Sequence, residues 1–224
     1  MKKLFICLLT FLLSTYCILS QNCSKYYPLK EGTNFQITTY DKKDRPSAVI
    51  NYEVKEFDGT KALMSTEVFD DKDKLVLSSD YNISCIGNGI SIDFKSMMSP
   101  DLFKQYSEME IDMDGTDIQI PNNLEAGQEL PDANMDMTIK MGPMNMNMSI
   151  NMVNRVVEGK ESITTPAGTF NCVVITYETE MKMGATRTGT SKQWLAEGVG
   201  MVKHEDYNKS GKLVSSSLLT SYSE

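Results

Sequence analysis

Two adjoining segments in which apolar and polar side chains alternate limit the fold of this chain more than any other feature. The segments are residues 134–141 and 144–157. Successive side chains of a β-strand point to opposite faces of a sheet, so this pattern predicts two strands that each bury one face. The alternating apolar residues are Met135, Met137, Ile139, Met141, Met144, Met146, Met148, Ile150 and Met152.

The dipeptide Gly142-Pro143 separates the two segments and suits a type II′ turn, in which glycine takes the positive φ and proline the second corner. A two-residue hairpin sets residue i opposite residue i+3, which places both rows of methionines on the same face of the sheet. A longer loop would keep the alternation and shift the partners. The expected cross-strand pairs are Met141–Met144, Ile139–Met146 and Met137–Met148.

Strand signals also dominate the rest of the chain, where runs rich in β-branched and aromatic residues are separated by short turn clusters. This spacing predicts an all-β fold, a curved antiparallel sheet meander that forms a half-barrel or an open barrel. The further strands expected are 35–40, 48–57, 62–69, 75–85, 90–94, 163–165, 169–183, 193–196, 200–207 and 212–222.

One short helix is expected near residues 99–107, because Ser99 is a favourable N-cap and Pro100 fits the first helical position. Residues 122–130 are mostly polar and bounded by prolines, which predicts a loop. No Ser/Pro-rich linker divides the chain. We therefore expect a single β-rich domain over residues 21–224, built either as one unit or as two packed halves, 21–120 and 134–224.

Residues 1–20 have the order of a secretory signal peptide, with Lys2 and Lys3 before an apolar run and small Ser20 at the expected cleavage point. This predicts an exported protein in the periplasm, associated with the outer membrane, or outside the cell. The apolar run is too short to span a bilayer, and no second one follows, so no membrane span is expected. Lipidation at Cys17 or Cys23 is the alternative, which would anchor the domain.

The formal net charge is −8, and it falls to −10 once the two lysines of the signal peptide are removed. Binding to nucleic acid depends on clustered Lys and Arg, so this charge argues against a nucleic-acid partner. An acidic surface otherwise favours solubility, and we expect a monomer. Three cysteines remain after cleavage. Cys172 lies in an apolar run typical of a buried thiol, which leaves Cys23 and Cys85 as the expected disulfide.

The sequence offers no catalytic constellation, and we expect no enzymatic activity, no cofactor and no catalytic or metal-binding residue. The single histidine, His204, lies in a charged strand and is expected at the surface, and no Gly-x-Ser-x-Gly motif surrounds a serine. A dyad of Cys172 and His204 lacks the electropositive, exposed setting that makes thiolates reactive. Zinc, calcium and phosphate-loop spacings are also absent from the sequence.

Methionine is the chemical peculiarity of the chain: there are sixteen, nine of them between Met109 and Met152. Three interpretations stay open. The methionines are ordinary strand packing, or they form an adaptable face that binds an apolar ligand or partner, or Met-x-Met pairs hold copper(I). Trp194, the single indole, is either a core anchor or part of the ligand site. The candidate ligand-binding residues are Met135, Met137, Met141, Met144, Met146, Met148, Met152 and Trp194.

Several segments spread over the chain after residue 20 resemble the TapB-like family of exported bacterial proteins, which is related to exported domains of unknown function. The most specific are the Thr164–Phe170 turn and the Trp194–Lys203 segment. The matching segments are Cys23–Gly32, Tyr40–Asp44, Asn154–Glu161, Thr164–Cys172 and Trp194–Lys203.

The resemblance implies a curved antiparallel half-barrel without enzymatic activity. The family name refers to association with a tetratricopeptide-repeat protein, which makes such a protein a candidate partner. It supplies no catalytic residues. The function expected is therefore a non-catalytic exported binding protein with an apolar or lipid-like ligand or a protein partner on its methionine-lined face. The alternatives are a structural or assembly component that docks a repeat protein, and copper(I) binding by the methionine rows.

Overall fold

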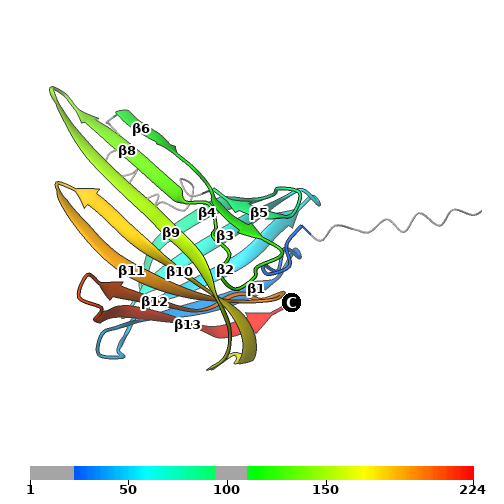
Figure 1. Cartoon of the computed structure of the whole chain (residues 1–224). Coiled ribbons are helices and arrows are strands. Elements are labelled where there is room, and N and C mark those ends of the chain that lie inside the picture. Colours follow the sequence, from blue (N-terminus) through cyan, green and yellow to red (C-terminus); the bar gives the residue numbers. More distant parts are fainter. Residues whose placement is uncertain (1–22, 94–109) are drawn as a thin grey trace, which may run out of the picture.

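The computed structural model describes residues 23–93 and 110–224, so the expected signal peptide (1–20) and the expected helix (99–107) lie outside the described residues. Every regular element in the described part is a strand, and thirteen strands form one antiparallel sheet (Figure 1). The strands are β1 (Asn34–Asp41), β2 (Pro46–Phe57), β3 (Lys61–Asp70), β4 (Leu75–Cys85), β5 (Gly89–Ile92), β6 (Glu110–Gly115), β7 (Ile118–Pro121), β8 (Ala133–Met141), β9 (Met144–Thr165), β10 (Gly168–Met183), β11 (Ala185–Ala196), β12 (Gly200–Asn208) and β13 (Leu213–Ser223).

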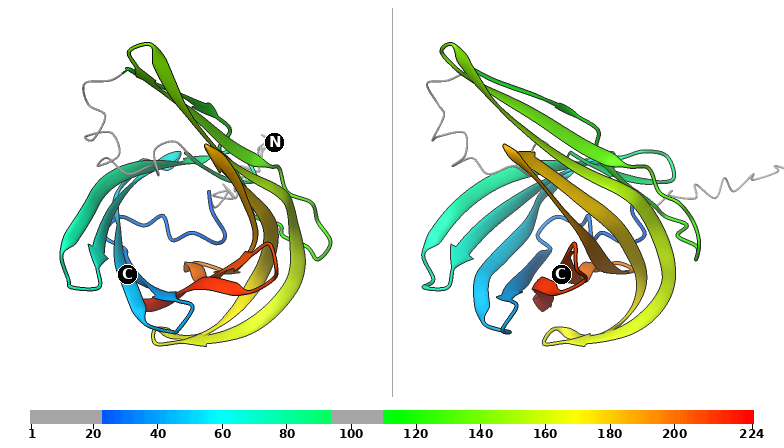
Figure 2. Two further views of the ribbon diagram at one scale, coloured as in Figure 1. Left: turned by 90° about the vertical axis from the view of Figure 1, so that its left-hand side faces the viewer. Right: turned by 60° about the vertical axis from the view of Figure 1, so that its left-hand side comes forward.

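The sheet is strongly curved, and in the end-on view its strands run most of the way around a ring (Figure 2). The strand order is β6-β8-β9-β10-β11-β12-β13-β1-β2-β3-β4-β5-β7, so the terminal strands β6 and β7 do not pair and the sheet stays open. The predicted all-β open barrel is therefore confirmed. None of the described residues forms a helix that is long and apolar enough to cross a membrane.

The hairpin of β8 and β9 has the predicted register. Gly142 takes φ = +59°, and the two strands pair directly on either side of Gly142-Pro143. Because the loop has only two residues, the alternation of the sequence carries over into the sheet without a shift. The pairs are Met141–Met144, Ile139–Met146 and Met137–Met148, as expected.

The N-terminal segment closes one end of the half-barrel. Residues 23–33 cross the interior in front of β1, and the predicted disulfide joins Cys23 to Cys85 at the end of β4 (Figure 2). Lys25 Nζ lies 2.8 Å from Glu197 Oε1 in the β11–β12 turn, so the segment is fastened to strands on both walls. We call this the closed end.

Hairpin turns project from the opposite end, which we call the open end. Three of these turns share one arrangement, in which the Oδ1 atom of an Asp or Asn accepts hydrogen bonds from the backbone N–H groups two and four residues later. The third residue after each Asp or Asn has a positive φ, of 57° or 73°. The capping residues are Asp41, Asp70 and Asn208.

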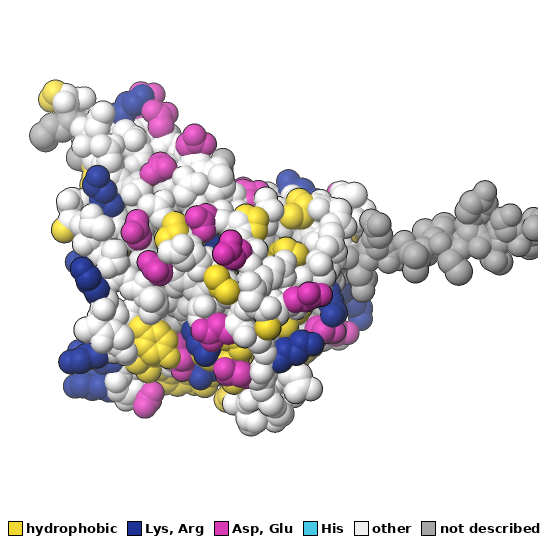
Figure 3. All heavy atoms as spheres, viewed as in Figure 1, with side chains coloured by type: hydrophobic (Ala, Val, Ile, Leu, Met, Phe, Trp, Pro, Cys, Tyr) yellow, Lys and Arg dark blue, Asp and Glu magenta, His cyan; other side chains and the backbone are white. Residues whose placement is uncertain are grey.

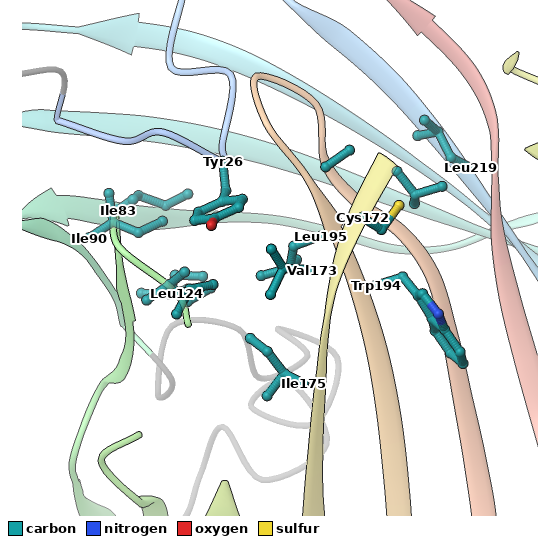
Figure 4. Close-up of a cluster of buried hydrophobic side chains, with 14 of the residues drawn as sticks. Tyr26, Ile83, Ile90, Leu124, Cys172, Val173, Ile175, Trp194, Leu195 and Leu219 are labelled. Carbon is teal, nitrogen blue, oxygen red and sulfur yellow. The ribbon is translucent and has the colours of Figure 1, made fainter. Parts of the chain in front are cut away.

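The main hydrophobic core fills the closed end. Side chains from both walls and from the N-terminal segment point toward one another there (Figure 4). The labelled residues that gather inside are Tyr26, Ile83, Ile90, Leu124, Val173, Ile175 and Leu195. Because β10 places Val173 and Ile175 on this side, the same alternation identifies which other side chains face the interior.

A loop and one side chain bridge the open seam between β9 and β7. The loop from β7 to β8 pairs with β9 through Leu130 N–H to Arg155 O (2.8 Å) and Val157 N–H to Gln128 O (2.9 Å). Arg155, only 2% exposed, donates from Nη1 to Pro131 O at 2.5 Å and from Nη2 to Gln119 O in β7 at 3.1 Å. The edge of the sheet is thereby covered at the closed end.

Candidate functional site

An apolar strip runs along the inner face of β9 and β10 toward the open end. Ile175 of β10 faces the interior and pairs with Val157, and the same face continues through the pairs Thr179–Met152 and Met181–Ile150. Met181 is 38% exposed and Met183 is 58% exposed, although both lie on the concave side of the sheet. We call this surface the methionine strip: Ile150, Met152, Met181 and Met183.

The neighbouring strands carry a second, buried group of methionines. Met135, Ile139, Met137 and Met148 are at most 9% exposed and form a core of their own, with Met113, Met146 and Ile150 packed against it. We call these four residues the methionine cluster. Of the expected ligand-binding methionines, Met135, Met137 and Met148 therefore pack in the protein interior. Met146 and Met152 are half-buried, and the side chains of Met141 and Met144 lie outside the description.

Trp194 lies on the other face of the sheet from the methionine strip. Leu195 faces the interior, so its neighbour Trp194 points away, as Figure 4 shows. The indole is 3% exposed, and its Nε1 donates to Glu161 Oε2 at 2.8 Å. The ammonium groups of Lys203 and Lys192 lie 4.5 Å and 5.3 Å from the ring centroid. The structure thus separates Trp194 from the methionines with which the sequence grouped it.

Four tyrosines and one arginine form a belt where the main core meets the methionine strip. Tyr52 of β2 and Tyr81 of β4 come from one wall, with Tyr52 paired to Phe35 and stacked on its ring at 4.7 Å. Tyr177 of β10 and Arg155 of β9 come from the other wall. Tyr27 of the N-terminal segment lies between the walls. We call these five residues the tyrosine–arginine belt.

Burial and mutual proximity shape the electrostatics of the belt. Burial raises the pKa of Tyr52 to about 12, and burial together with the nearby phenols of Tyr52 and Tyr27 raises the pKa of Tyr81 further. The pKa of Tyr27 is raised by burial and by Tyr52 and Tyr177, while Arg155 opposes the rise. Tyr81 and Tyr177 from the two walls belong to the main core, and Tyr27 and Tyr52 pack against it. All of these phenols are protonated donors at neutral pH.

One donor of the belt is buried and lacks a protein partner. Within residues 23–93 and 110–224 this donor is Arg155 Nε, whereas the hydroxyls of Tyr27, Tyr52 and Tyr81 are not among the buried atoms left unpaired. Burial lowers the pKa of Arg155, and Tyr177, Asp132 and Tyr27 act in the opposite direction. A buried cation with an unpaired donor is costly unless an acceptor joins it.

A polar network of β11, β12 and β13 adjoins the belt on the inner face. Asp206 accepts hydrogen bonds from Ser191 Oγ (2.7 Å) and Ser215 Oγ (2.9 Å), and it contacts His204 Nε2 at 2.9 Å. Burial opposes ionisation, but these three partners hold the pKa of Asp206 at about 2. Ser191 and His204 both contact the carboxylate and not each other, so this is not the arrangement of nucleophile and base. His204 is half-buried and not the surface residue expected.

The other nucleophile considered from the sequence, Cys172, does not face His204. Cys172 is buried on the face of β10 opposite Ile175, whereas the register of β10, β11 and β12 places His204 on the same face as Ile175. Burial raises the pKa of the Cys172 thiol to about 11. The described part of the chain also contains no group of three or more His, Cys, Asp or Glu residues placed to hold a metal ion.

A family model described as DUF3108-like matches residues 30–219, which covers all but the N-terminal segment and the last residues of the described fold. The chain belongs to the DUF3108-like family. The narrower TapB-like resemblance stays a prediction. No curated protein matches the chain significantly.

Two solved structures share the fold of this DUF3108-like chain. A "putative lipoprotein" from Parabacteroides distasonis is 25% identical and superposes with a TM-score of 0.73, covering 91% of this chain and 100% of its own. A "putative exported protein with YmcC-like fold" from Bacteroides fragilis is 21% identical with a TM-score of 0.72, covering 90% and 100%. The open curved sheet is therefore a shared architecture and not peculiar to this sequence.

The outer surface of the DUF3108-like sheet contrasts with its interior. Acidic and basic side chains are interspersed over the face shown in Figure 3, and hydrophobic side chains gather mainly at its lower edge, over β12 and β13.

The tyrosine–arginine belt was missed by sequence reasoning, because its members are spread from Tyr27 to Tyr177 and each is an ordinary residue in its own segment. The register of the sheet and the path of the N-terminal segment bring these residues together.

Proposed function

We propose that this DUF3108-like chain is a non-catalytic exported protein that binds an apolar or lipid-like ligand on its inner face. The observation that carries the proposal is the methionine strip, where Met181 and Met183 stay exposed on the concave side of the sheet. Apolar side chains exposed in a concavity favour a ligand over simple packing. Methionine suits such a surface because its flexible side chain adapts to irregular partners.

Three observations support export to the cell envelope. Residues 1–20 have the pattern of a secretory signal. The Cys23–Cys85 disulfide suits an oxidising compartment. The two solved structures are described as a "putative exported protein" and a "putative lipoprotein", which supports the proposed location.

The proposal is tested by binding of phenylnaphthylamine, a neutral apolar dye, to the purified protein. The double substitution Met181→Asp/Met183→Asp places two charges on the strip and is expected to weaken dye binding at least about fivefold. Val214→Asp is the control, because the exposed fraction of Val214 (48%) lies between those of Met181 and Met183 but Val214 follows the β12–β13 turn outside the strip. Failure of the unaltered protein to bind the dye, or equal loss in the control, would overturn the proposal.

A repeat-protein partner is a second candidate, in line with the TapB-like resemblance. Leu75 and Val214 are each 48% exposed, and both directly follow hairpin turns of the open end. Exposed apolar residues of this kind suit a docking surface. In an affinity pull-down from envelope extracts, Val214→Asp should then remove a specific repeat protein while leaving dye binding intact. Recovery of no such protein by the unaltered chain would exclude this candidate.

Copper(I) binding is the third candidate, and one cross-strand row favours it. Met113 of β6, Met137 of β8 and Met148 of β9 stand directly beside one another in the sheet. Thioether sulfur is a soft ligand for copper(I), and cross-strand neighbours are close enough to share an ion. Calorimetric titration with copper(I) that shows no tight binding would exclude it.

A further inference from the structure

We infer that the ligand of the inner face is a long-chain amphiphile with a compact anionic head, a fatty acid, and that the tyrosine–arginine belt receives its carboxylate. The inference rests on the proposed function and adds the chemical class of the ligand. In the bound state the Arg155 Nε–H and the hydroxyls of Tyr27 and Tyr52 donate hydrogen bonds to the carboxylate.

The donors come from three separate elements that border the main core. Arg155 belongs to β9, Tyr52 to β2, and Tyr27 to the N-terminal segment. Tyr27 and Tyr52 both pack against the main core, and Arg155 donates to Pro131 O and Gln119 O, whose neighbours Leu130 and Ile120 belong to the same core. Such convergence from two walls is typical of a site that orients one polar group within an otherwise apolar surface.

The belt is rich in donors and poor in acceptors. Phenols of raised pKa keep their protons, so each one offers an O–H group, and Arg155 Nε has no protein acceptor within the described residues. The nearest carboxylates are already engaged. Asp132 is exposed and accepts from the Asn154 backbone N–H at 3.1 Å, and Asp206 is held by its own network. An added carboxylate would balance the buried charge of Arg155, whereas a neutral or cationic head would leave it unmatched.

The methionine strip provides the path for the acyl chain. Tyr177 of the belt and Met183 at the open end lie six residues apart on the inner face of β10, a distance of about 20 Å in an extended strand. This distance matches the span of a long acyl chain. The exposed fraction rises along the same path, from half-buried Met152 to the exposed Met181 and Met183, so the tail would extend toward the open end.

Palmitate and hexadecanol test the inference, because they share the chain and differ in the charge of the head. Each is titrated from cyclodextrin into the purified protein. The unaltered protein is expected to bind palmitate at least about tenfold more tightly than hexadecanol, the effect of one charge-assisted hydrogen bond or more. In Tyr27→Phe/Tyr52→Phe this preference should disappear through weaker palmitate binding, with hexadecanol unchanged. Tyr40→Phe, which removes a hydroxyl outside the belt, is the matched control.

The outcomes separate the inference from the proposed function. Equal binding of palmitate and hexadecanol would overturn the anionic headgroup and leave the apolar ligand standing. Binding of neither, together with no binding of the dye, would overturn both. The phenylalanine variants keep the rings and remove only the hydroxyls, so they test the donors of the belt. A retained preference in the double variant would also contradict the inference.

Discussion

The Nη2 atom of Arg155 donates a hydrogen bond to the carbonyl oxygen of Gln119 at 3.1 Å, and this contact joins strands near opposite ends of the sheet order. β9 is third from one end, and β7 is the last strand at the other. The same guanidinium donates to Pro131 O, in the loop that connects β7 to β8. A side chain therefore links two strands, β7 and β9, whose backbones do not pair with each other.

Replacement of Arg155 by methionine should destabilise the protein by about 2–4 kcal/mol. Two carbonyl oxygens in part-buried hydrogen bonds would lose their donor, and the buried guanidinium group would be lost from the seam. Urea denaturation of Arg155→Met against the unaltered protein measures the effect. Arg187→Met, in an exposed position of β11, is the control and should change stability by less than about 0.5 kcal/mol. A similar small change for both variants would contradict the role of Arg155 in the seam.

Removal of the disulfide should destabilise the fold strongly. Cys23 and Cys85 are 62 residues apart, and closing a loop of this length is worth on the order of 4 kcal/mol in the chain-entropy description. The double variant Cys23→Ser/Cys85→Ser avoids an unpaired thiol and should lower the urea midpoint with little change in slope. Tyr27 should become accessible in hydrogen–deuterium exchange before the strands do, since the disulfide fastens its segment. An unchanged midpoint would count against this.

Asp206 should make stability depend on pH in acid. Its folded-state pKa of about 2 lies below the ordinary value near 3.9, so its carboxylate favours the folded state above about pH 4. That contribution is lost as the pH falls toward about 2. Asp206→Asn lacks it at every pH. The unaltered protein should be more stable than the variant above pH 4, and the difference should shrink toward pH 2 in urea titrations. A difference that stays constant over this range would contradict the assignment.

The β12–β13 turn should tolerate asparagine better than alanine at Gly211. The residue has φ = +73°, and nothing lies within 4 Å of the position of an added Cβ. Any cost of substitution therefore comes from the backbone, about 1 kcal/mol for alanine and less for asparagine, which adopts this region more readily. Asp44 and Asp73 hold the equivalent position in the two related turns at φ = +57°. Equal stability of Gly211→Ala and Gly211→Asn in thermal unfolding would show that the turn relaxes.

Cys172 should resist alkylation in the folded protein. Burial raises its pKa to about 11, so little thiolate is present at pH 8, and the side chain is also shielded from reagent. Iodoacetamide followed by mass spectrometry should label no cysteine in the native protein and one in urea without reductant. Rapid native labelling would show that this part of β10 opens readily.

Sequence patterns predict the fold best where alternation and turn length act together. The β8–β9 hairpin is correct to the residue because Gly142-Pro143 leaves only one short connection. β6 and β7 were missed, since every second residue of the short β6 is acidic and β7 has four residues and ends in Pro121. The predicted start of β11, Gln193, is eight residues later than its actual start at Ala185. The prediction was too short because residues 185–190 are exposed or nearly so and carry no apolar periodicity.

The candidate site was predicted only in part. The methionines whose side chains are described share one face, as the hairpin register requires, but burial divides them between the methionine cluster and the methionine strip. Alternation states which face a side chain takes and not what covers that face. His204 was expected at the surface because its neighbours are charged, whereas Asp206, two residues on, lies on the same inner face and binds it.

The attachment of the N-terminal segment at the closed end has a consequence for orientation. Cys23 is tied to β4, and the open end with its exposed methionines lies at the far end of the strands (Figure 1). A chain tethered to a membrane by residues before Cys23 would therefore have its open end turned away from that membrane. A ligand of the inner face would then enter and leave on the side of the protein that is remote from the membrane.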